Sequence, residues 1–103
     1  MPWGTWINEL PTAFFMVVHI AAFALGAGFA WFAFKRELNV LGTAFSLFAV
    51  AELTYMTYHL DWTVFLFAHT IAEVFDLVAF VLVFAAAVWQ VTGARRPAFE
   101  QVS

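Results

Sequence analysis

The chain has 103 residues, of which 65% are hydrophobic and 11% charged, and its formal net charge is −3. Soluble domains are about half apolar and about a quarter charged, so this composition indicates a membrane protein. Four basic residues cannot form a patch that neutralises phosphates, which excludes a nucleic-acid partner, and the lack of cysteine excludes disulfides, thiolate metal sites and cysteine nucleophiles.

Three apolar runs are long enough to cross a bilayer, which takes about 20 residues in a helix. They cover residues 12–34, 38–60 and 62–91, and a short tail follows at 92–103. The connections between them are short, so neighbouring helices should be antiparallel. The sequence therefore predicts an all-α integral membrane protein, a single domain over residues 1–103 with three transmembrane helices in an up-down-up arrangement.

Basic residues and tryptophans orient these spans. The basic residues all fall on one side of the predicted bilayer, at Lys35, Arg36, Arg95 and Arg96. The tryptophans, which favour bilayer interfaces, divide into an outer set and an inner set: Trp3, Trp6 and Trp62, then Trp31 and Trp89. The positive-inside rule then predicts a multi-pass protein of the cell membrane, with its N-terminus outside and its C-terminal tail in the cytoplasm.

The first span carries one histidine on a face of small residues. At helical spacing His19 shares this face with Ala22, Gly26 and Ala30. Small residues in this pattern let helices approach closely in lipid. We therefore expect this stripe to pack against another helix, and His19 to point at that helix and away from lipid.

The second span places an acidic residue and a histidine together. Glu52, Met56 and His59 share one face, and Tyr55 lies at its edge. Tyrosines near the ends of spans usually anchor the interface. We therefore expect Tyr55 to be an anchor and Glu52 and His59 to be the polar groups of interest.

The third span contains the stretch HTIAEVFD, residues 69–76. His69 and Glu73 are four residues apart, and Glu73 and Asp76 are three apart, so all three lie within about 60° on one helical face. An ionisable side chain at bilayer depth costs about 2.5 to 3.5 kcal/mol on insertion scales. This face must therefore meet another helix, a partner chain, water, a metal ion or a cofactor.

Counting residues from the outer boundary groups the polar side chains by depth. Four of them fall about 10 to 16 Å below the outer surface at 1.5 Å per residue: His19, Glu52, His69 and Glu73. Asp76 lies deeper, near the midplane, and His59 lies near the outer rim. Three helices offer few faces for so many polar groups, so we expect a homo-oligomer or a place among other membrane subunits.

This cluster is compatible with two main chemistries. Two histidines and two carboxylates suit a divalent metal ion such as Zn, Fe, Mn or Cu, with His19, His69 and Glu73 as ligands and Glu52 as a fourth ligand or an orienting group. Alternatively, histidines and carboxylates stepped along a span are typical of a proton path, here His59, His69, Glu73 and Asp76.

Two further alternatives remain open. His19 and His69 have matched depth and could ligate one b-type haem from opposite sides inside a complex. The same polar residues could instead serve helix packing in a non-catalytic assembly, accessory or sensor-type module. No enzymatic activity is expected of the isolated chain.

Overall fold

The computed structural model describes residues 3–93 as one short 3₁₀ helix and three long α-helices. These are η1 (Thr5–Glu9), α1 (Thr12–Lys35), α2 (Asn39–His59) and α3 (Phe65–Gly93). Each of the three α-helices is long and apolar enough to cross a membrane, which confirms the prediction of three such helices. The predicted tail lies outside the described residues from position 94 onward, and Arg95 and Arg96 lie there with it.

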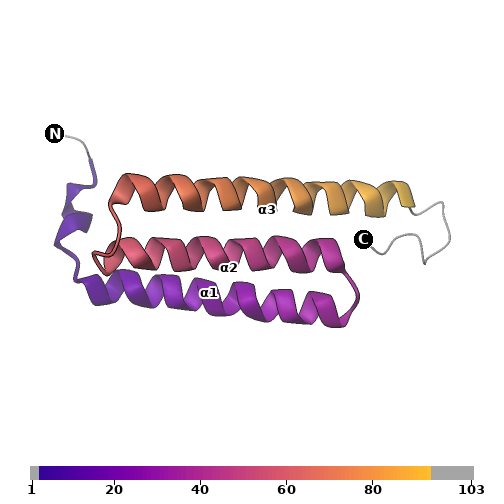
Figure 1. Ribbon diagram of the computed structural model, residues 1–103, viewed down its shortest axis with the longest axis horizontal. Coiled ribbons are helices and arrows are strands. Elements are labelled where there is room, and N and C mark those ends of the chain that lie inside the picture. The colour runs from indigo at the N-terminus through magenta and orange to yellow at the C-terminus, as the bar shows by residue number, and fades with distance from the viewer. Residues whose placement is uncertain (1–2, 94–103) are drawn as a thin grey trace.

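The three α-helices form a single row with α2 in the middle. Figure 1 shows them side by side, with the chain reversing direction at each connection. Helix α2 packs against both α1 and α3, whereas α1 and α3 make no contact with each other. Because the row is one helix thick, one face of α2 can line up with faces of both neighbours, and that shared face carries the polar residues.

The first connection is a Schellman turn, which takes only three residues. Glu37 has a positive φ of 63°. Its N–H donates to the carbonyl of Phe34 at 3.0 Å, and the N–H of Leu38 donates to the carbonyl of Ala33 at 2.9 Å. This hydrogen-bond pair is the usual way in which a helix ends when its next residue is left-handed. The position normally holds glycine, so Glu37 is strained there.

The second connection repeats this motif and explains where α3 begins. Asp61 also has a φ of 63°, and its N–H donates to the carbonyl of Tyr58 at 3.0 Å. The N–H of Trp62 donates to the carbonyl of Thr57 at 2.9 Å. Residue 62 therefore still belongs to the end of α2. The predicted start of the third span at residue 62 was three residues early, and the helix runs two residues past the predicted end at 91.

Small residues hold the helices together in the half near the first connection. A Cβ atom at Gly42 would lie 2.7 Å from the ring of Phe34, and one at Gly26 would lie 2.8 Å from the ring of Phe48. Alanines fill much of the remaining interface, including Ala30, Ala33, Ala44, Ala49 and Ala51, all of them buried. Within residues 3–93 no large side chain is completely buried, so the large apolar side chains mostly face outward.

Candidate functional site

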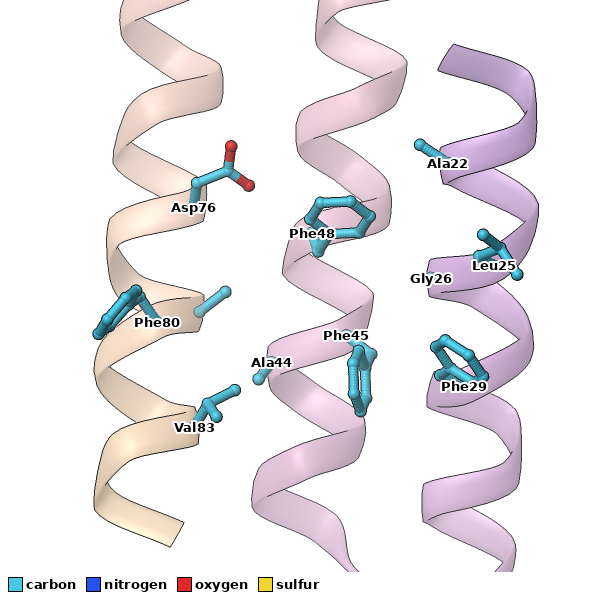
Figure 2. Close-up of a pocket in the computed structure, with 11 residues that line it drawn as sticks. Ala22, Leu25, Gly26, Phe29, Ala44, Phe45, Phe48, Asp76, Phe80 and Val83 are labelled. Carbon is cyan, nitrogen blue, oxygen red and sulfur yellow. The ribbon is translucent and has the colours of Figure 1, made fainter. Parts of the chain in front are cut away.

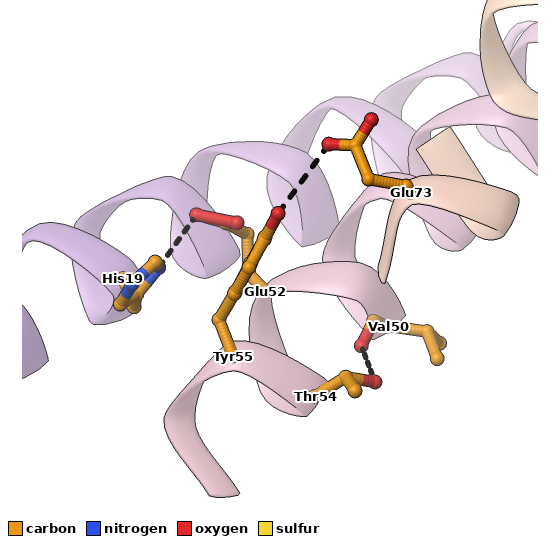
Figure 3. Close-up of polar contacts among 6 residues, drawn as sticks. All are labelled: His19, Val50, Glu52, Thr54, Tyr55 and Glu73. Atoms are coloured by element: carbon orange, nitrogen blue, oxygen red, sulfur yellow. Dashed lines mark hydrogen bonds and ion pairs between the residues drawn. The ribbon is translucent and has the colours of Figure 1, made fainter. Parts of the chain in front are cut away.

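The structure brings four polar side chains of the three helices into one group, here called the polar cluster: His19, Glu52, Tyr55 and Glu73. Figure 3 shows them, with α1 supplying the histidine, α2 the two central residues and α3 the second glutamate. By contrast, the hydroxyl of Thr54 donates to the carbonyl of Val50 at 3.0 Å in its own helix. Some polar residues of the spans therefore link helices, and others are satisfied within their own helix.

The link between α1 and α2 is the pair His19 and Glu52. Nδ1 of His19 lies 3.1 Å from Oε1 of Glu52, and both side chains are mostly buried, with 16% and 11% exposed. Helical spacing produces this contact, because Gly26 and Ala30 on the same stripe of α1 are buried against α2. A buried histidine–carboxylate pair can hold and transfer a proton.

The link between α2 and α3 is the tyrosine that sequence reasoning treated as an anchor. The hydroxyl of Tyr55 donates to Oε1 of Glu73 at 3.4 Å, and its ring stacks on that of His19 with centroids 5.2 Å apart. Tyr55 therefore connects both outer helices. One signal could have identified it, because Tyr55 lies three residues after Glu52 and thus on the same face of α2.

His59 extends the polar cluster toward the end of α2. Its ring stacks on Phe15 with centroids 4.9 Å apart and lies 5.1 Å from the ring of His19. A cavity of about 370 Å³ opens beside it, with polar lining from Asn8, Thr12, Tyr58 and Asp61. His59 therefore lies between this cavity and His19.

Asp76 lies one turn beyond Glu73 on α3. Its Oδ1 atom is buried and has no hydrogen-bond partner within the described residues. The side chain lines an apolar groove on the same face of the row, and Figure 2 shows its carboxyl group pointing toward α2. Asp76 therefore stands where the polar half of this face meets the apolar half.

His69 does not join the polar cluster. Its ring stacks on Phe65 with centroids 5.2 Å apart. In residues 3–93 no hydrogen bond or ion pair connects it to His19, Glu52 or Glu73, and no group of three or more histidine and acidic side chains could hold a metal ion. His19 and His69 also lie on the two helices that do not touch. The metal site and the haem site stay predictions from sequence.

Comparisons with known proteins give no assignment. No family model, no curated protein and no solved structure matches the chain. The chemistry open to the site is therefore that of its own side chains. These are histidines, carboxyls and a phenol, all of which can give or take a proton.

Proposed function

We propose that the chain is an integral protein of the cell membrane, with its N-terminus outside and its C-terminus in the cytoplasm. The first connection supports this orientation. Lys35 lies over the ring of Trp31 at 4.6 Å, and Arg36 lies over that of Phe32 at 4.7 Å. Basic side chains beside aromatic rings are typical of the cytoplasmic interface, where the charge reaches the headgroups and the ring stays at the apolar boundary.

Within that membrane, the chain acts as a small module that passes protons between the outer surface and the midplane. The proposed relay, in order of proton transfer from the outer side, is His59, His19, Glu52, Tyr55, Glu73 and Asp76. The observation that carries this proposal is the run of contacts from the polar cavity to Glu73: His59 against His19, His19 bonded to Glu52, and Tyr55 bonded to Glu73. Water from the cavity would bridge the remaining gaps.

The relay covers only half of the bilayer. Residues 20–34, 39–51 and 77–93 contain no histidine, lysine, arginine, aspartate or glutamate. A proton that reaches Asp76 therefore needs another chain to continue toward the cytoplasm. This asymmetry favours a homo-oligomer or a larger membrane complex over a lone chain that conducts protons across the whole membrane.

One competing function uses the same contacts. The His19–Glu52 pair ties α1 to α2, and the Tyr55–Glu73 hydrogen bond ties α2 to α3. Interhelical hydrogen bonds of this kind can simply fix the arrangement of helices in an assembly or sensor module. In that case the side chains would have no need to exchange protons with the outer solution.

Infrared difference spectroscopy distinguishes the two functions. The protein is reconstituted in liposomes, the outer solution is changed to D₂O, and exchange of the Asp76 carboxyl proton is followed, with its band assigned by Asp76→Asn. We expect Tyr55→Phe and Glu52→Gln to slow this exchange about tenfold, equivalent to about 1.4 kcal/mol of added barrier. Thr54→Val, which removes a hydroxyl that is satisfied within α2, is the matched control and should leave the rate unchanged. An equal rate in all four proteins would support packing alone.

A further inference from the structure

The face of the row that carries the polar residues becomes apolar beyond Asp76, toward the first connection. This apolar half contains a groove, of which the proposed relay uses only Asp76. It has a volume of about 470 Å³ and is lined by all three α-helices. Figure 2 shows Phe29 on α1 and Phe45 and Phe48 on α2 beside it, with Asp76 at one end, and Phe80 of α3 is also among its lining residues. The groove exists because its other lining residues are mostly small, so the aromatic rings of α1 and α2 border a space that they do not fill.

Asp76 is the only titratable residue in this lining. Its Oδ1 atom is buried without a hydrogen-bond partner in the described part of the chain. A buried polar atom without a partner is unfavourable, and more so in a membrane where lipid tails supply none. The groove therefore offers aromatic faces along its length and one unsatisfied carboxyl group at its end.

The size of the groove decides which kind of occupant fits it. Its lining spans residues 22–29 of α1, 44–48 of α2 and 76–83 of α3. Eight helical residues extend over about 10 Å, whereas a helix of a partner protein would run along the bilayer for about 30 Å. A volume of this size is within the range of small-molecule sites, which are mostly apolar and aromatic with a few polar groups.

We propose that the groove binds a lipid-soluble quinone. The planar ring lies among the phenylalanine rings, where aromatic faces stack, and a quinone carbonyl accepts a hydrogen bond from the protonated carboxyl group of Asp76. The alkyl tail leaves past Val83 into the bilayer. The proposal shares with the proton relay the placement in the membrane and Asp76, which ends the relay and also lines the groove. The exchange experiment on the relay contains no quinone, so either proposal can fail while the other stands.

Scintillation-proximity binding of tritiated 2-decyl-1,4-naphthoquinone to the immobilised protein in mild detergent tests this proposal. We expect saturable binding of about one quinone per chain. Asp76→Leu should weaken it about tenfold, as expected for losing a hydrogen bond in an apolar site. Asp76→Asn, which keeps a hydrogen-bond donor, should bind within a few-fold of the wild type. The hydrocarbon 2-decylnaphthalene, which has no carbonyl groups, should compete poorly.

A matched pair of substitutions locates the site. Val83 lines the groove and is 41% exposed, while Val78 lies on α3 outside the lining and is 43% exposed. Val83→Trp should abolish binding, and Val78→Trp should leave it unchanged. Equal competition by decylnaphthalene, or full affinity in both Asp76 variants, would overturn the proposal. Absent binding in the wild type would also overturn it, and disulfide cross-linking of Leu25→Cys chains would then show that a second copy covers the groove.

Discussion

The face of the row that carries the polar residues has an outer half, near the second connection, and an inner half, near the first connection. Different interactions hold the helices together in these two halves. In the outer half, the His19–Glu52 contact connects α2 to α1, and the hydrogen bond that Tyr55 donates to Glu73 connects α2 to α3. In the inner half, Gly26 and Gly42 let aromatic rings approach the helix backbones closely. On α1, no titratable residue lies between His19 and Lys35. Hydrogen bonds between membrane helices contribute little each, whereas close packing cannot yield without a shift of the rings. The inner half should therefore set stability and the outer half should carry the chemistry.

The largest expected effect is on the inner half. Gly42→Ala would place a Cβ atom 2.7 Å from the Phe34 ring. We expect the free energy of unfolding to fall by about 1 to 3 kcal/mol, as is typical of overpacking. Unfolding in mixed micelles under increasing denaturing detergent measures this. Gly28 is the matched control, because a Cβ atom there would meet nothing within 4 Å. Gly28→Ala should leave stability unchanged or raise it by up to about 1 kcal/mol.

The turns lie outside both halves and should respond in the opposite direction. Glu37 and Asp61 both have a φ of 63°, which costs a residue with a Cβ roughly 1 to 2 kcal/mol. We expect Glu37→Gly and Asp61→Gly each to raise the free energy of unfolding by about 1 kcal/mol, as measured in the same micelles. Glu37→Ala, which keeps the Cβ, controls for loss of the carboxylate and should give no such gain. A fall in stability on introducing glycine would argue against these turns.

The smallest expected effect is on the outer half. Tyr55→Phe removes the hydrogen bond to Glu73 and leaves the aromatic ring in place against His19. Such bonds contribute about 0.6 kcal/mol on average and at most about 1.7 in a membrane protein. We expect the free energy of unfolding to fall by about 0.6 kcal/mol. If Tyr55→Phe destabilised the protein more than Gly42→Ala, the division between a stabilising half and a chemical half would be wrong.

Much of this architecture follows from the sequence, because length and apolar content specify the three helices directly. The contact of His19 with a neighbouring helix was also predicted, since its face carries small residues. Residue depth, however, does not determine which helices touch. His69 was placed with His19 and Glu52 on depth alone, and the single-row arrangement leaves it against Phe65.

Two other features could not be derived from local patterns. The role of Tyr55 depends on α3 bringing Glu73 within reach, which is a tertiary contact. The start of α3 depends on the amide of Trp62 closing the end of α2, and hydropathy does not distinguish an apolar residue in a helix from one in such a turn.

The central claim is that water from the outer side reaches the polar, outer half of this face. It does not reach the apolar, inner half. The chain has no cysteine, so single-cysteine variants report one position each. The measurement is the reaction of Glu73→Cys and Phe80→Cys with a charged, membrane-impermeant thiol reagent, added to either side of oriented vesicles. Glu73→Cys should react only from the outer side, and Phe80→Cys from neither. Equal reaction of both variants, or reaction of Glu73→Cys only from the cytoplasmic side, would contradict this account.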